Sequence, residues 1–117
     1  MIPGLCSLIY AGFRSSSGIF AYLTETNLNA SGVPGPIVSS TTTCEVIGGT
    51  APYTYAWVYI TGDANITPAS PTNATTSFNG TIISTDDSTS AAYACNVTDS
   101  GAHMTQSNVV NMTFNGL

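Results

Sequence analysis

Charged side chains are nearly absent from this 117-residue sequence, which has one Lys or Arg against six Asp or Glu and a formal net charge of −5. The single basic residue is Arg14, and there is no lysine. Nucleic-acid binding needs several basic side chains to neutralise phosphates, so the composition excludes a nucleic-acid partner. The same lack argues against binding to an anionic membrane surface. Because copies with so little charge repel each other weakly, we expect a multi-copy or homo-oligomeric protein that works in contact with other proteins.

Long apolar runs are also missing. None approaches the roughly 20 residues that a membrane-spanning helix needs. The N-terminal stretch MIPGLCSLIYAGFRSSSG contains an apolar run, but Arg14 follows this run, whereas a secretory signal carries its positive charge in front. We therefore expect synthesis as a soluble cytosolic product and no membrane partner.

The residue sets that most enzymes use are not present either. His103 is the only histidine, and Asp99 and Ser100 lie near it in the sequence only as members of one turn, TDSGAHMT. A nucleophilic triad needs serine, histidine and carboxylate side chains that meet in space, and there is no Gly-x-Ser-x-Gly elbow. With one histidine and no CxxC pair, a zinc site lacks ligands. The sequence thus predicts a protein that is not an enzyme and holds no cofactor.

Carboxylates in predicted loops raise the alternative of a calcium site, since calcium binds oxygen ligands. The candidates are Asp63, Asp86, Asp87 and Asp99. Their spacing matches no EF-hand, and aspartates in turns commonly end strands. We predict turn-forming roles and no metal site.

The residues that are abundant favour strands and turns. Ser, Thr, Asn and Gly supply the polar part of the chain, and short apolar segments recur every 8 to 12 residues from residue 37 onward. This spacing predicts an all-β antiparallel sandwich of about seven strands. YTYAWVYI is the strongest strand signal, and its apolar residues on both faces indicate a central strand. The expected core residues are Cys44, Trp57, Phe78, Tyr93, Cys95, Val97 and Met112.

A change in composition at GVPGP, residues 32 to 36, predicts a stiff connector. We therefore divide the chain into an N-terminal arm with its connector, residues 1–36, and a sandwich domain, residues 37–117. The arm carries two apolar pieces, LCSLIYAGF and GIFAYL, around a serine-rich turn. About thirty residues cannot bury both pieces alone, so the arm is expected to dock on the domain or on another subunit. Cys6 is expected to be an apolar residue of this arm.

The spacing of three core residues resembles the immunoglobulin-like pattern. Cys44 lies 13 residues before Trp57, Trp57 lies 38 before Cys95, and Tyr93 stands two before Cys95. The stretches GGTAPYTYAWVYITGD and YACNVTDSG resemble the immunoglobulin-like and PKD-like modules of bacteriophage virion proteins and bacterial surface proteins. The resemblance implies that Cys44, Trp57 and Cys95 occupy strands B, C and F, with Tyr93 as a tyrosine corner.

The resemblance leaves the state of the two cysteines open. Cys44 and Cys95 would form either a disulfide between the sheets or, in a reducing cytosol, a pair of buried thiols beside Trp57. The tyrosine row Tyr53, Tyr55 and Tyr59 raises a similar choice between sugar stacking and core packing. Core packing is favoured, because Tyr55 shares a face with Trp57.

The resemblance also implies a function. It points to a non-enzymatic structural protein of a bacteriophage particle, made in the bacterial cytoplasm and located at the virion surface. A capsid decoration protein is favoured slightly over a tail accessory, and residues 1–36 would bind the major capsid or tail protein. The alternative is an adhesin module that binds host-surface glycans weakly.

Overall fold

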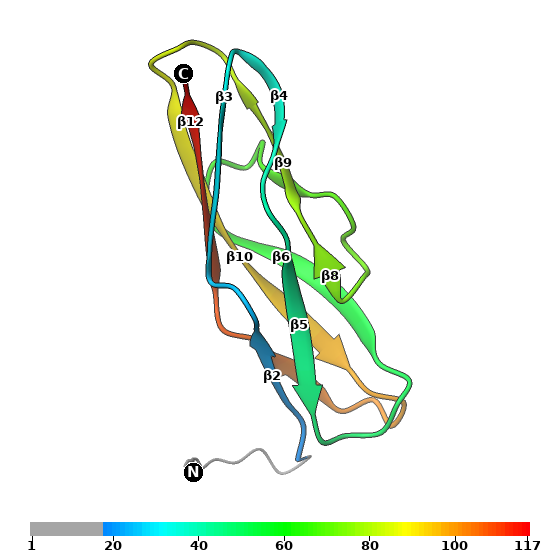
Figure 1. Cartoon of the computed structure of the whole chain (residues 1–117). Helices are drawn as coiled ribbons and strands as arrows, with labels where there is room; N and C mark the ends of the chain where they lie inside the picture. Colours follow the sequence, from blue (N-terminus) through cyan, green and yellow to red (C-terminus); the bar gives the residue numbers. More distant parts are fainter. Residues whose placement is uncertain (1–17) are drawn as a thin grey trace.

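The computed structural model describes residues 18–117, and these residues form strands and turns without a helix. Cys6 and Arg14 lie outside the described residues. The strands are β2 (Phe20–Leu23), β3 (Asn27–Gly32), β4 (Gly35–Val38), β5 (Thr42–Ile47), β6 (Thr54–Gly62), β7 (Thr67–Pro68), β8 (Thr75–Thr76), β9 (Phe78–Ile82), β10 (Ser88–Thr98), β11 (Met104–Gln106) and β12 (Val110–Gly116). The predicted all-β sandwich is confirmed (Figure 1).

One layer of the sandwich is built around β10, the longest strand. β6 pairs with one edge of β10, and β11 followed by β12 pairs with the other edge, all antiparallel. β3 then pairs with β12 in parallel, with Leu28 opposite Met112. This layer therefore has the order β6, β10, β11/β12, β3.

The second layer contains two broken strands, β4/β5 and β8/β9. β5 lies between β2 and β8, while β9 lies between β4 and β7, and all these pairs are antiparallel. The resulting order is β2, β4/β5, β8/β9, β7. The two most N-terminal described strands thus divide between the layers, with β2 in one and β3 in the other.

The core lies between the two layers. Phe78 and Phe114 are fully buried at its centre, and Trp57 packs edge-on against Phe78 with ring centroids 5.9 Å apart. All seven residues that the sequence assigned to the core are buried, with at most 6% of their surface exposed. Alternation along the strands is the reason: an inward side chain recurs every second residue, as in the buried–exposed pattern of β9.

The structure changes the predicted boundary at residue 36. β2 and β3 lie within the part assigned to the arm, yet each is paired into a layer of the sandwich. GVPGP spans the end of β3, a bend at Val33 and Pro34, and the start of β4, where Gly35 adopts φ 137°, so it does not join two units. The described part of the predicted arm is therefore part of the domain, and residues 1–17 lie outside the described residues.

Among the strands of residues 18–117, β6 also differs from expectation, because it pairs with β10 alone and forms an edge of this layer. The apolar residues on both faces of β6 therefore do not reflect a second partner strand. The Trp57 backbone N–H donates to the carbonyl of Pro71 at 3.0 Å, and the indole N–H donates to the carbonyl of Asn73 at 2.8 Å. The segment after β7 thus covers this edge where a central strand would have a second neighbour.

Candidate functional site

Cys44 on β5 and Cys95 on β10 meet in the core from opposite layers. Both are free thiols and are buried, with 3% and 0% of their surface exposed, and Trp57 is the residue opposite Cys95 in the β6–β10 register. A hydrogen bond with Cys95 lowers the pKa of the Cys44 thiol, while the same bond and burial raise the pKa of Cys95. Cys44, Trp57 and Cys95 thus lie on three different strands, β5, β6 and β10. A buried pair without access to solvent suits packing or a cross-link and does not suit nucleophilic catalysis.

Tyr93 is buried as expected, but its hydrogen bond is not that of a tyrosine corner. A corner tyrosine bonds to backbone a few residues upstream, at the turn that leads into its own strand. Here the Tyr93 hydroxyl donates to the carbonyl of Ile66 at 2.6 Å, across 27 residues of sequence. Tyr93 therefore ties the middle of β10 to the connection between β6 and β7.

Asp99 organises the turn between β10 and β11. Its carboxylate accepts hydrogen bonds from the backbone N–H groups of Thr50, Gly101 and His103 and lies 3.2 Å from His103 Nδ1. Burial raises the pKa of Asp99, but these hydrogen bonds outweigh it, so that the pKa lies below its ordinary value. Among residues 18–117 the His103 ring makes no hydrogen bond to Ser100, and the hydrogen bonds of the Asp99 carboxylate hold two loops together. This cluster has a structural role.

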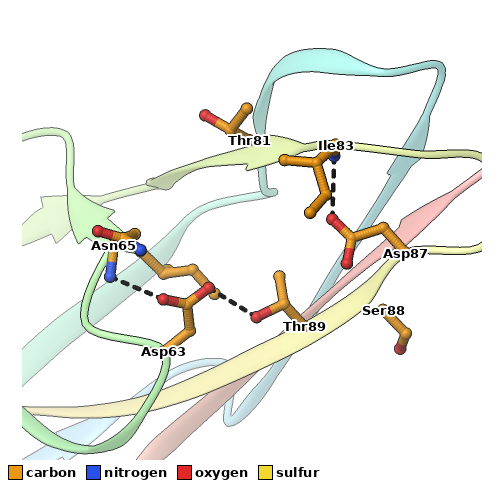
Figure 2. A pocket seen from close by; sticks show the side chains of 8 residues that line it. Asp63, Asn65, Thr81, Ile83, Asp87, Ser88 and Thr89 are labelled. Atoms are coloured by element: carbon orange, nitrogen blue, oxygen red, sulfur yellow. Dashed lines mark hydrogen bonds between the residues drawn. The ribbon is translucent and has the colours of Figure 1, made fainter.

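A polar hollow opens beside the ends of β6 and β9 and the start of β10 (Figure 2). It has a volume of about 510 Å³ and is lined by Asp63, Asn65, Ile66, Thr81, Ile83, Asp87, Ser88 and Thr89.

Both carboxylates of the hollow hold turns. Asp63 accepts the Asn65 N–H at 2.9 Å and the Thr89 hydroxyl at 2.7 Å, and these two bonds lower the pKa of Asp63. Asp87 accepts the Ile83 N–H at 3.0 Å (Figure 2). The hollow therefore offers hydrogen-bonding groups, and none of its described lining residues is aromatic.

Of the four aspartates weighed as calcium ligands, only Asp63 and Asp87 line one hollow. Asp99 belongs to the β10–β11 turn, and Asp86 does not line the hollow. Within residues 18–117, no group of three or more His, Cys, Asp or Glu side chains lies together.

The tyrosines of the β6 segment do not form an exposed row. Tyr53 and Tyr55 are half-buried against the core, and only Tyr59 is exposed. The hydroxyls of Tyr53 and Tyr59 donate to the carbonyls of Gly48 and Gly62. Core packing, the favoured interpretation, agrees with this arrangement.

An exposed apolar patch covers the outward face of β2 and β5 and consists of Phe20, Tyr22 and Ile47. These side chains are 56%, 40% and 57% exposed. Phe20 stands directly opposite Ile47, and the Phe20 and Tyr22 rings lie 6.1 Å apart. The sequence placed Phe20 and Tyr22 in the arm. The alternation in FAYL was the signal that could have identified one buried and one exposed face.

Comparisons with known proteins show the fold and no more. No family model matches the chain, and no curated protein matches it. No helix among residues 18–117 is long and apolar enough to cross a membrane. One similar solved structure is described as a nucleoside hydrolase-related hypothetical protein from Saccharophagus degradans that is associated with carbohydrate metabolism. The TM-score is 0.51 at 13% identity, and the match covers 85% of this chain but only 25% of that one.

Proposed function

We propose that this chain is a non-enzymatic structural protein of a bacteriophage particle. In this proposal it is a capsid decoration protein that exposes its immunoglobulin-like sandwich at the virion surface. The carrying observation is the apolar patch formed by Phe20, Tyr22 and Ile47, because it lies on the strand that directly follows the apolar N-terminal residues. Exposed apolar surface of this kind is typical of protein interaction sites.

The surroundings of the patch support a protein partner. Glu45, opposite Tyr22, is the charged residue on this part of β5, so a partner can cover the patch while desolvating little charge. The described polar clusters around Asp99 and Asp63 hold turns, and the thiols Cys44 and Cys95 are buried. These features favour binding over catalysis.

The test is deletion of residues 1–17. The deletion stops at residue 17, because removing residues 1–36 would also remove β2 and β3 from the sandwich. We expect the shortened protein to stay folded, by circular dichroism and thermal unfolding, and to be lost from purified particles. Normal incorporation of the folded, shortened protein would contradict anchoring by the N-terminal residues.

Copy number distinguishes the two virion locations. Quantitative mass spectrometry of purified particles should find hundreds of copies for a decoration protein and a handful for a tail accessory. If the protein is missing from particles altogether, the virion proposal fails.

A glycan-binding adhesin module is the second candidate. The polar hollow favours it, because Asn65, Thr81 and Ser88 offer hydrogen-bonding groups of the kind that bind sugar hydroxyls. None of the lining residues within 18–117 offers an aromatic ring for sugar stacking, which places this candidate second. Binding of the isolated protein to a glycan array, abolished by Thr81→Ala, would favour the adhesin function over the virion function.

A further inference from the structure

The apolar patch of Phe20, Tyr22 and Ile47 stands beside the point where the described chain begins. Gly18 has φ 73°, a conformation that changes the direction of the chain and suits glycine. Its carbonyl oxygen packs against Gly48, where an added Cβ would come within 1.9 Å of that oxygen. This close approach fixes the position of residue 18, two residues before Phe20, so the preceding segment starts next to the patch.

The preceding segment has the composition of an occupant for this patch. Residues 5–13, LCSLIYAGF, contain no charged residue and are mostly apolar. Residues 14–17, RSSS, are polar and short, and four residues match the usual length of a connection between strands that fold back on each other. Nine extended residues reach about 30 Å, which is ample to cross two neighbouring strands about 5 Å apart.

We propose that residues 5–13 of the same chain fold back at residues 14–17 and pack on the patch of Phe20, Tyr22 and Ile47. A segment tethered by four residues has an effective concentration in the millimolar range, so it outcompetes a second copy at ordinary protein concentrations. The free protein thereby covers its apolar N-terminal residues and its exposed patch together. The inference concerns the free protein and does not rest on its location in a particle.

The sequence supplies an unusually specific probe of this docking. Trypsin cleaves after Lys or Arg, and Arg14 is the only such residue in the chain. Cleavage by trypsin therefore reports on one bond, between Arg14 and Ser15. Because proteolysis follows the population of the open form, docking slows this cleavage.

The main variant is Ile47→Ser, which removes half-exposed apolar surface from the patch. We expect cleavage after Arg14 to become roughly fivefold faster, since part of the burial that closes the segment is lost. Val38→Ser is the matched control: Val38 is also 57% exposed and lies in the same layer, on β4, outside the patch. The control should be cut at the rate of the unaltered protein.

Two further measurements decide the proposal. Ile9→Ser changes the segment and leaves the described sandwich untouched, so it should speed cleavage as Ile47→Ser does even if Ile47→Ser disturbs folding. Equal cleavage rates for the unaltered protein and Ile9→Ser would overturn the proposal. Protection that increases with protein concentration would also overturn it, because the occupant would then be a second copy.

Discussion

The hydroxyl of Tyr93 donates a 2.6 Å hydrogen bond to the carbonyl oxygen of Ile66, and both residues are buried. The bond joins the central strand β10 to the connection that leads from β6 to β7. Ile66 also lines the polar hollow. The hydrogen bond from Tyr93 in the core therefore holds one of the residues that line the hollow in place.

Tyr93→Phe is therefore expected to lower the free energy of unfolding by about 1–3 kcal/mol, because it leaves the buried Ile66 carbonyl without its donor. Urea unfolding measures the change. Tyr59→Phe is a matched control, since the Tyr59 hydroxyl also bonds to a backbone carbonyl but on an exposed residue where water can replace it. Equal losses for the two variants would show that the buried bond has no special role.

Local patterns in the sequence were enough to predict the sandwich and its core. Cys44, Trp57 and Cys95 lie on strands and are buried as predicted, because alternation along a strand determines which side chains enter the core. The boundary at residue 36 was wrong for a physical reason. A turn that reverses a chain and a linker that separates units use the same residues, Gly and Pro, and only long-range pairing tells them apart.

The strands that pair with the predicted arm are distant from it in the sequence. β3 joins the sandwich through β12, so Leu28 lies opposite Met112, which is near the other end of the chain. The Tyr93–Ile66 bond is likewise a tertiary contact. The apolar patch depends on β2 pairing with β5, which brings Phe20 opposite Ile47. Such contacts leave no local signature in a single sequence.

Gly80 on β9 faces the ring of Phe114 on β12 across the core. An added Cβ at Gly80 would lie 2.7 Å from two ring carbons, and Phe114 is fully buried. Gly80→Ala should therefore cost about 1–3 kcal/mol of unfolding free energy through overpacking. Urea unfolding tests this, with Asn79→Ala, an exposed neighbour, expected to change stability by less than about 0.5 kcal/mol.

Steric crowding between an added Cβ at residue 80 and the Phe114 ring can be distinguished from a general intolerance of Gly80 to substitution. Phe114→Leu removes ring atoms from the crowded space, so its effect and that of Gly80→Ala should be coupled in a double-mutant cycle. The double variant should lose less stability than the sum of the two single variants. Strict additivity would contradict a steric origin.

The lowered pKa of Asp99 predicts acid sensitivity of the β10–β11 turn. The folded protein holds this carboxylate deprotonated to a lower pH than the unfolded chain does, so its contribution is complete above the ordinary aspartate value of about 3.9. That contribution is lost as the pH falls through the lower, folded-state pKa. Asp63 acts in the same direction, since its pKa is also lowered.

Asp99→Asn should lower the melting temperature near neutral pH and flatten, without abolishing, its decline below about pH 4. Thermal unfolding between pH 2 and 7 gives both quantities. Asp86→Asn removes a carboxylate that makes no hydrogen bond within residues 18–117, so it is the charge-matched control for the loss of melting temperature near neutral pH. If the melting temperature of Asp99→Asn declined with falling pH as steeply as that of the unaltered protein, Asp99 would not be the source of the acid sensitivity.

The contact between Cys44 and Cys95 predicts a redox-dependent stability. We expect mild oxidation to join the two sulfurs, because they meet across the core and already interact as thiols. In the chain-entropy account, closing the loop between them would stabilise the fold by an amount on the order of 4 kcal/mol. The measurement is urea unfolding of Cys6→Ser with and without reductant, together with alkylation under denaturing conditions to count free thiols. The difference in unfolding free energy with and without reductant should vanish in the control variant Cys6→Ser/Cys44→Ala. Two free thiols in the oxidised Cys6→Ser protein would show that Cys44 and Cys95 stay reduced.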